Sequence, residues 1–190
     1  MKYLSMGNSK LAKDGIACFS LPAVKTCPFA AECKKICYAC KGMYRFPSVK
    51  AKRERNYKLT QSKRFLAVMD AEVKACKAKI IRIHDSGDFY SRQYAAEWIE
   101  IIRNNPDKLF YCYTKSACFI WADWPSNFIL IMSVGGVNDK DIDQARDVHA
   151  QVFVSKDALL GAGYFYGNDS DLAVIKYIQS GGIKVGLVKH

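Results

Sequence analysis

Short apolar runs alternate with amphipathic stretches along most of this chain. Apolar runs bounded by glycine, proline or polar residues predict strands, and apolar residues recurring every three or four positions predict helices. The predicted strands are residues 15–21, 79–84, 109–114, 128–134, 151–155 and 183–188. The predicted helices are residues 48–77 in two pieces, 91–104, a short irregular segment at 116–121, 139–147 and 169–180.

This alternation predicts an α/β fold. Apolar strands separated by helices are typical of a parallel sheet that helices cover. Two architectures fit the pattern, a partial (β/α)6 TIM-like barrel and an open, mostly parallel sheet, and periodicity does not separate them. In both, the chemistry is expected at the carboxyl ends of the strands. The length predicts a single domain over residues 1–190.

Positive charge is concentrated in the N-terminal half. Residues 1–79 hold 18 Lys and Arg against 5 Asp and Glu, whereas residues 80–190 hold 11 against 13. This imbalance suggests an anionic partner, either nucleic acid bound through residues 50–64 or a phosphorylated small molecule. A solvated helix face explains the same charge equally well.

The chain shows no sign of membrane insertion or export. No apolar run approaches the length of a membrane span, and the first residues lack the apolar core of a signal peptide. We therefore expect a cytoplasmic protein, in the host cytoplasm if it is phage-encoded. In that reducing compartment, the eight cysteines are expected to be metal ligands or buried thiols rather than disulfides.

Half of these cysteines fall within one short segment, residues 27–42, which is called the cysteine loop below. Thiolates this close in sequence can converge on one inorganic core, so the leading prediction is a [4Fe–4S] cluster. With three thiolate ligands, one iron stays open to a substrate or cofactor. With four, the cluster transfers electrons or is structural. The candidate metal ligands are Cys27, Cys33, Cys37 and Cys40.

Other interpretations of the loop are weaker. A structural zinc site usually pairs two short cysteine hooks across a longer spacer, which is missing here. The pair Cys37 and Cys40 has dithiol spacing but does not open a helix in a thioredoxin-like unit. Unligated thiolates beside lysines would be prone to oxidation. The remaining cysteines, Cys18, Cys76, Cys112 and Cys118, are expected to pack in the core or to lie outside the site.

Polar residues follow the second predicted strand, where α/β folds carry their sites. His84 can move a proton or ligate iron, and Asp85 and Asp88 can accept hydrogen bonds from an amine or hydroxyl. These three are the candidate catalytic residues. The alternative is structural, with Asp88 or Ser91 capping the next helix and Asp85 binding a backbone amide. The candidate cofactor-binding residues are Tyr38, Ser86, Gly87, Gly135 and Gly136, the glycines because they let backbone approach a ligand.

The run from Cys33 to Cys40, with the pattern C-x3-C-Y-x-C, resembles the cluster motif of the radical S-adenosylmethionine superfamily. Residues 86–88, Ser-Gly-Asp, are similar to its Gly-Gly-Glu-like segment, which holds the amino group of the methionine moiety. The resemblance implies a partial barrel of six β/α units. It also implies that Cys33, Cys37 and Cys40 bind the cluster and that S-adenosylmethionine binds the open iron.

A second resemblance covers much of residues 7–136, and it is to the phage-encoded "gene product 88" family. The segments that carry it are G-N-S-K-L (7–11), F-S-L-P-A-V-K-T-C-P (19–28), C-Y-A-C-K-G-M-Y-R (37–45), I-H-D-S-G-D-F-Y (83–90) and S-V-G-G (133–136). The family pattern stresses the equivalents of Cys27, Cys33 and Cys37. It therefore implies Cys27 as a ligand and makes Cys40 optional. No cysteine follows Cys118, so one cluster is expected.

Together these patterns predict an iron–sulfur protein. The favoured activity is that of a minimal radical-S-adenosylmethionine-like or redox enzyme, with a small-molecule substrate or an electron donor as partner. S-adenosylmethionine is a candidate second cofactor. The alternative is a nucleic-acid-binding module without catalysis, stapled by zinc or a cluster.

Overall fold

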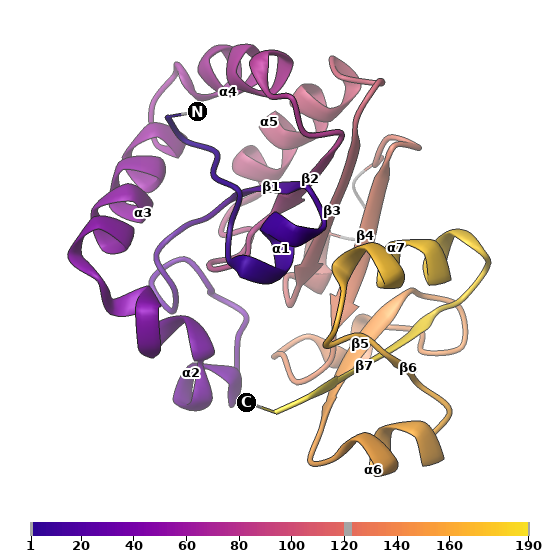
Figure 1. Ribbon diagram of the computed structural model, residues 1–190. Helices are drawn as coiled ribbons and strands as arrows, with labels where there is room; N and C mark the ends of the chain where they lie inside the picture. Colours follow the sequence, from indigo (N-terminus) through magenta and orange to yellow (C-terminus); the bar gives the residue numbers. More distant parts are fainter. Residues whose placement is uncertain (1, 120–122, 190) are drawn as a thin grey trace.

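A parallel sheet runs through the protein, with helices packed against both faces (Figure 1). The computed structural model describes residues 2–119 and 123–189. Within those residues, seven strands form the sheet in the order β1-β2-β3-β4-β5-β7-β6, and each adjacent pair is parallel. The strands are β1 (Ile16–Phe19), β2 (Ile80–Ile83), β3 (Leu109–Thr114), β4 (Phe128–Ser133), β5 (His149–Phe153), β6 (Phe165–Tyr166) and β7 (Lys184–Val188). The predicted α/β fold with an open, parallel sheet is confirmed.

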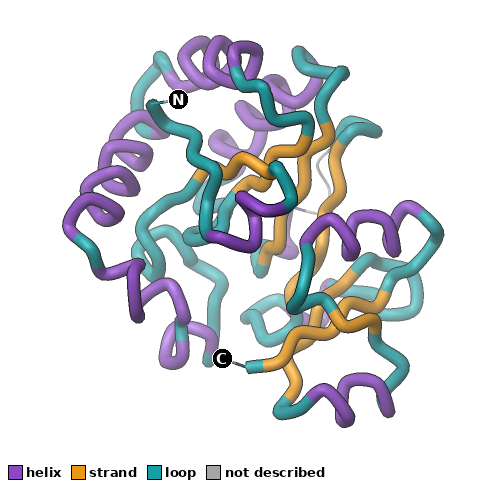
Figure 2. Tube along the Cα trace, viewed as in Figure 1, coloured by secondary structure: helices purple, strands orange, loops and turns teal. Residues whose placement is uncertain are grey.

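Helices of different lengths surround the strands (Figure 2). The longest, α3, α4 and α5, lie between β1 and β3 in the sequence. The α-helices are α1 (Ser9–Lys13), α2 (Cys33–Ile36), α3 (Pro47–Thr60), α4 (Phe65–Ala75), α5 (Arg92–Arg103), α6 (Lys156–Gly161) and α7 (Asp171–Gln179). The 3-10 helices are η1 (Tyr38–Cys40), η2 (Gly42–Arg45), η3 (Ala117–Phe119) and η4 (Asp139–Asp141). None of the helices in the described part of the chain is long and apolar enough to cross a membrane.

Two apolar clusters hold the layers together, one on each face of the sheet. Alternate residues of a strand point to opposite faces, so Phe19 of β1 packs with Trp98 of α5, in the cluster that α4 and α5 cover. Its neighbour Cys18 belongs to the opposite cluster, with Leu11 of α1 and Val174 of α7. Every residue of β1 is buried, as expected for a strand covered on both sides.

A buried carboxylate links α7 to the sheet and to the N-terminal segment. Asp171 is 1% exposed; its carboxylate pairs with Arg82 at 2.8 Å and Lys10 at 2.7 Å and accepts a hydrogen bond from the Tyr111 hydroxyl at 2.5 Å. Burial by itself raises the pKa of Asp171, but the charges of Arg82 and Lys10 outweigh it and hold that pKa below its usual value. Asp14, which ends α1, adds a second link by accepting from Ser170 Oγ at 2.8 Å and from the backbone N–H of Leu172 at 3.1 Å.

Two predicted elements differ in the structure. The strand predicted at 151–155 lies two residues earlier, as β5. The helix predicted at 139–147 is wrong, because the structure has η4 followed by turns. There Asp143 Oδ1 accepts from the backbone N–H of Ala145 at 3.0 Å, and the Asp147 carboxylate accepts from that of Asp143 at 2.8 Å. Such local bonds offer the backbone an alternative to the helix.

Several short elements have no counterpart in the sequence prediction. The helices α1 and α6 and the two-residue strand β6 are too short to show a clear apolar period. Side-chain caps define both helices, because Asn8 accepts from Leu11 N at 3.1 Å and Ser155 accepts from Ala158 N at 3.2 Å. The segment predicted as helical at 116–121 contains η3, and its last two positions lie outside the described residues.

Replacing Asp171 with alanine should lower the free energy of unfolding by about 3–5 kcal/mol, because it leaves the Arg82 guanidinium buried without its counter-charge. Chemical denaturation at neutral pH measures this loss. The difference from wild type should shrink as the pH falls through the folded-state pKa of Asp171, since protonation removes the same charge. As a control, the double variant Arg82→Met with Asp171→Leu should recover most of the stability. An Asp171→Ala protein as stable as wild type would contradict this account.

Candidate functional site

The segments that follow β1 and β2 are hydrogen-bonded to each other at the carboxyl edge of the sheet. The backbone N–H of Leu21 donates to the carbonyl of Ser86 at 2.8 Å, and Ser86 Oγ donates to the carbonyl of Leu21 at 2.5 Å. Farther along, the N–H of Asp88 donates to the carbonyl of Thr26 at 3.1 Å. These bonds fix the start of the cysteine loop over the segment that follows β2.

Gly87 lies at the closest approach of the two segments. Its φ is +84°, a conformation that side-chain-bearing residues rarely adopt. A Cβ at this position would lie 2.5 Å from Leu21 Cβ and 2.7 Å from Thr26 Oγ1. Close packing against this chain's own loop thus accounts for the glycine. A cofactor-binding role for Gly87 stays a prediction.

The cysteine loop is also held at two further points. Ala30 forms an antiparallel bridge with Gly136, which follows β4, and the N–H of Val137 donates to the carbonyl of Phe29 at 2.9 Å. The Tyr38 hydroxyl donates to the main-chain oxygen of Asp85, which follows β2. The loop therefore lies across the carboxyl ends of several strands, where the sequence placed the site.

The structure brings the four thiols of the cysteine loop into one neighbourhood. All four are free, and they are at least partly exposed, whereas Cys18, Cys76 and Cys112 are buried. Burial raises the pKa of Cys27 to about 12, and the charges of Asp88, Cys37 and Cys33 contribute in the same direction. Burial also raises the pKa of Cys37, with further contributions from Cys40 and Cys33.

The thiols are near one another without forming a closed ligand set. Among the described residues, no group of three or more Cys, His, Asp or Glu side chains is arranged to hold a metal ion. Binding of a metal or cluster would therefore require the loop to draw its sulfur atoms together. Two short helical turns of the loop, α2 and η1, carry Cys33 and Cys40 and are separated at Cys37.

The buried carboxylate of Asp88 joins the segment after β2 to the end of β3. Oδ1 accepts from the N–H of Phe89 at 2.8 Å and from Thr114 Oγ1 at 2.5 Å, while Oδ2 accepts from the N–H of Lys115 at 2.8 Å. Burial raises the pKa of Asp88 to about 6, although these hydrogen bonds favour its charged form. The cap of α5 is Ser91 instead, whose Oγ accepts from Tyr94 N at 3.2 Å.

Lys115 is a site residue that the sequence analysis did not select. Its ammonium donates to Ser133 O at 3.1 Å, Ser133 Oγ at 2.8 Å and Val134 O at 2.8 Å. Burial lowers the pKa of Lys115, and the charges of Cys33, Asp139, Asp88 and Cys27 oppose that shift. The ammonium thus places positive charge near two candidate ligands. Its position at the end of β3 was the available signal.

The two glycines after β4 are already hydrogen-bonded within the chain. The N–H groups of Gly135 and Gly136 each donate to the Asp139 carboxylate at 2.7 Å. A ligand at this turn would have to compete with Asp139 or use the carbonyl side of the backbone. The predicted cofactor role of both glycines therefore stays a prediction, as it does for Ser86, whose hydroxyl binds Leu21.

His84 is oriented toward the core that α5 covers. Its φ is +66°, its ring packs against Phe89, and its Nε2 lies 2.7 Å from the Tyr94 hydroxyl. Its Nδ1 has no hydrogen-bond partner among the described residues. Burial and, to a lesser degree, the charge of Arg82 lower the pKa of His84 to about 3. The ring is thus neutral at physiological pH, and its candidate catalytic role stays a prediction.

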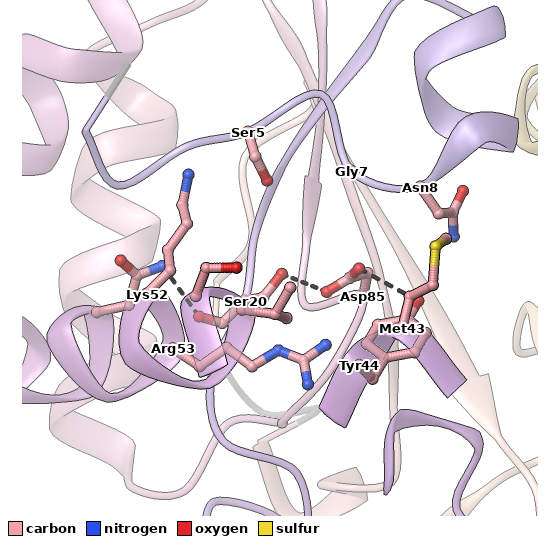
Figure 3. A pocket seen from close by; sticks show the side chains of 12 residues that line it. Ser5, Gly7, Asn8, Ser20, Met43, Tyr44, Lys52, Arg53 and Asp85 are labelled. Carbon is pink, nitrogen blue, oxygen red and sulfur yellow. Dashed lines mark hydrogen bonds between the residues drawn. The ribbon is translucent and has the colours of Figure 1, made fainter. Parts of the chain in front are cut away.

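Asp85 faces a cavity of about 370 Å³ beside β1 (Figure 3). Its carboxylate accepts hydrogen bonds from Ser20 Oγ and, at 3.4 Å, from the Tyr44 hydroxyl. Its main-chain oxygen accepts from Tyr38, so Asp85 lies between the cysteine loop and the cavity. Ser20 and Tyr44, which orient this carboxylate, were not selected from the sequence.

The basic segment 50–64 does not form one exposed face. Lys50, Arg55 and Lys58 are exposed on α3, but Arg53 is buried and Lys52 is partly buried at the cavity. Two of the basic side chains predicted to bind nucleic acid, Lys52 and Arg53, are therefore directed into the protein. Nucleic-acid binding through the exposed residues stays a prediction.

The sequence of this chain matches a known protein family. The family model described as "Gene product 88" matches residues 2–188. The chain belongs to the gene product 88 family. The second of the two resemblances found in the sequence is thereby confirmed, and it extends over nearly the whole chain.

Two relatives in the gene product 88 family come from mycobacteriophages. The "Gene 88 protein" of Mycobacterium phage L5 is 38% identical over 136 residues, which cover 64% of this chain and 56% of that protein. The "Gene 88 protein" of Mycobacterium phage D29 is 35% identical over 136 residues, which cover 64% of this chain and 55% of that protein. The matched region thus spans about half the length of these relatives. No solved structure is significantly similar to the chain.

Replacing Gly87 with alanine should destabilise this gene product 88 protein by about 1–3 kcal/mol more than replacing Gly181 with alanine. Both glycines have positive φ, +84° and +96°, but a Cβ at Gly181 would meet nothing within 4 Å. The control therefore isolates backbone strain from the collision with Leu21 and Thr26. Chemical denaturation gives both values, and limited proteolysis should show faster cleavage in the cysteine loop of the Gly87→Ala variant. Equal losses in the two variants would mean that the close contact has no energetic role.

Proposed function

We propose that this protein binds a [4Fe–4S] cluster through the cysteine loop and uses it in an enzymatic reaction. The observation that carries the proposal is the gathering of four free thiols on one short loop that lies across the strand ends. Thiols used for packing would be expected in the interior, like Cys18 and Cys112.

The chemistry of the surroundings fits an anionic cluster. Thiolates are the ligands of [4Fe–4S] clusters, and four of them add negative charge that nearby cations offset. The Lys115 ammonium lies close enough to Cys33 and Cys27 for their charges to act on its pKa. Lys34 and Lys41, within the loop itself, are exposed and free to reorient. The raised pKa of Cys27 means that metal binding must displace a proton from this thiol.

The thiols are not equivalent as ligands. Cys27 follows Thr26, whose carbonyl accepts a hydrogen bond from the N–H of Asp88. The charges of Cys33 and Cys37 both act on the pKa of Cys27. Cys40 is the exposed member of the set. We therefore assign Cys27, Cys33 and Cys37 as the core ligands, with Cys40 as a fourth ligand or as a thiol that leaves one iron open.

The reaction we favour is of the radical-S-adenosylmethionine-like or simpler redox type. The cysteine loop follows β1 and is bonded to the segment after β2, the two segments that the superfamily resemblance implicates. Tyr38 connects them directly through Asp85, whose carboxylate is available at the cavity wall. When bound, the cluster would supply electrons or an open iron. The chain itself would position a small molecule beside Asp85.

A nucleic-acid-binding module, stapled by zinc or by the cluster, is the second candidate. The exposed Lys50, Arg55 and Lys58 on α3 support it. If binding uses these phosphate contacts, its affinity should fall steeply with salt. A zinc site would leave the purified protein colourless, so the experiment below separates zinc from a cluster, and the salt dependence tests nucleic-acid binding.

Anaerobically reconstituted wild-type protein should be brown and contain about four iron and four sulfide per chain, as the cluster formula requires. Single Cys27→Ser, Cys33→Ser and Cys37→Ser variants should lose most of this iron and the visible absorption, because each removes a thiolate ligand. Cys118→Ser is the matched control, a partly exposed thiol outside the loop, and it should keep both. Cys40→Ser decides the ligand number, since retained iron indicates three protein ligands and lost iron four.

Wild-type protein that remains colourless and free of iron after reconstitution would overturn the cluster assignment. A protein that instead purifies with one zinc ion, lost in the loop variants alone, would establish the structural alternative. Because the sulfur atoms must be drawn together, loading should also slow proteolysis of residues 27–42.

The S-adenosylmethionine assignment has a separate test. The reduced, loaded protein should convert S-adenosylmethionine to 5′-deoxyadenosine or methylthioadenosine, detected by liquid chromatography. The Cys33→Ser variant, which cannot hold the cluster, should give none. A loaded wild-type protein that forms neither product, yet is reduced and reoxidised reversibly, would identify it as a redox protein without this cofactor.

A further inference from the structure

The cavity beside β1 contains features that the proposed cluster does not use. Its volume is about 370 Å³, and its wall comes from the N-terminal arm, the residue after β1, η2 and the first turns of α3. Figure 3 shows Lys52 on one side, Tyr44 and Asp85 on the other, and the Arg53 guanidinium extending toward Tyr44. None of the four thiols of the cysteine loop lines it. The cavity lies within the size range of small-molecule sites.

Arg53 is a buried cation without a counter-charge in the described part of the chain. Its side chain is 6% exposed, and the residue has no ion pair there. Its guanidinium lies 4.5 Å from the Tyr44 ring centroid and donates one long hydrogen bond, 3.4 Å, to Ala39 O. A guanidinium has five N–H donors, and a buried charge is costly unless it is paired. An anion is therefore the missing partner.

Lys52 places a second positive charge on the same wall. Its ammonium donates to Leu4 O, and no ion pair among the described residues includes it. Burial lowers the pKa of Lys52, which indicates that the cavity withdraws this group from water. Even with the Asp85 carboxylate on the same cavity, the two cations leave its lining with a net positive charge, which favours an anionic group such as a phosphate.

The first turn of α3 adds backbone N–H donors and a partial positive charge to the same wall. Ser48 and Val49 line the cavity at the start of this 14-residue helix. The helix has no side-chain cap and no acidic residue in its first turn. Its free N–H groups and the positive end of its dipole favour an anion. The buried Arg53 independently requires an anion at the same place, so the two observations support each other.

One buried acceptor at this cavity, the side-chain oxygen of Asn56, has no hydrogen-bond donor among the described residues. Asn56 is 0% exposed, and its Nδ2 donates to Tyr3 O at 3.1 Å and Ser20 O at 3.0 Å. Both of these neighbours are acceptors, which fixes the orientation of the amide. Its Oδ1 then has no partner among the described residues. An unpaired buried acceptor is costly, so a ligand hydroxyl would relieve it.

We propose that this cavity binds a small phosphorylated molecule that carries free hydroxyl groups, such as a sugar phosphate or a nucleoside monophosphate. Arg53, Lys52 and the start of α3 bind its phosphate. Asn56 Oδ1 and the Asp85 carboxylate accept hydrogen bonds from its hydroxyl groups. The cavity encloses its cations, so a small molecule fits it better than a nucleic-acid strand. This assignment goes beyond the cluster and does not require it.

Asp85 gives the site its position relative to the cysteine loop. The carboxylate lines the cavity, while the main-chain oxygen of the same residue holds Tyr38 of the loop. A bound molecule therefore lies next to the segment that carries the candidate metal ligands. The proposed ligand is a candidate substrate for the cluster, although its binding can be measured without one.

Isothermal titration of the purified full chain with ribose 5-phosphate and with adenosine monophosphate tests the proposal, before and after cluster reconstitution. At least one should bind saturably at millimolar concentration or tighter, and ribose and inorganic phosphate alone should each bind at least about tenfold more weakly, because each satisfies half of the site. Binding must appear in the unreconstituted protein too. A failed reconstitution would thus overturn the cluster and leave this result standing.

The Arg53→Gln variant should bind at least about tenfold more weakly, through loss of a charge-assisted contact. Lys50→Gln is the matched control on the same helix. It removes an equal charge from an exposed position outside the cavity and should change the affinity less than twofold. Lys52→Gln provides a second variant if Arg53→Gln does not fold, as judged by circular dichroism. In wild type, amide resonances of Ser48 and Val49 should shift on titration.

Absence of saturable binding of both probes to wild type would overturn the proposal. Equal losses in Lys50→Gln and Arg53→Gln would also do so, because they would indicate diffuse attraction to a basic surface. Amide resonance shifts confined to residues of α3 outside the cavity, such as Lys50, would also overturn the proposal.

Discussion

The close backbone contact between the segments after β1 and β2 is the constraint on which the rest of the site depends. It exists because Gly87 has no side chain and adopts a positive φ against Leu21 and Thr26. The reciprocal hydrogen bonds of Leu21 and Ser86 and the bond from Asp88 to Thr26 then set where the cysteine loop begins. Without this contact, the cysteine loop would no longer be held in a fixed position over the ends of the strands.

The contact also decides how the acidic residues after β2 are used. Asp88 is directed inward and joins its neighbours Phe89, Thr114 and Lys115, whereas Asp85 is directed toward the cavity. His84, one residue earlier, is directed into the core beneath α5. Three polar residues that are close in sequence thus serve different environments, and Asp85 is the one that meets both the cysteine loop and open space.

Much of this architecture could be predicted from the sequence. Strands β2, β3 and β4 are apolar runs with polar ends, and they were located within about one residue of their observed bounds. The crowding of the four cysteines also identified the loop. Charge counting could not show that Arg53 is buried while Lys50 is exposed, because helical period alone does not reveal which face packs. The failure at residues 139–147 has a different cause, since there Asp143 and Asp147 replace helical bonds with local ones.

The links between α1 and α7 have a consequence for how the protein is made. Lys10 and Asp14 contact Asp171, Ser170 and Leu172, near the opposite end of the chain. During synthesis from the N-terminus, the charges of Lys10 and Arg82 emerge long before the carboxylate that neutralises them. The nascent chain must keep this face of the sheet hydrated until α7 leaves the ribosome. Closure of this face is therefore governed by a contact of very high sequence separation, which forms only after α7 has been made.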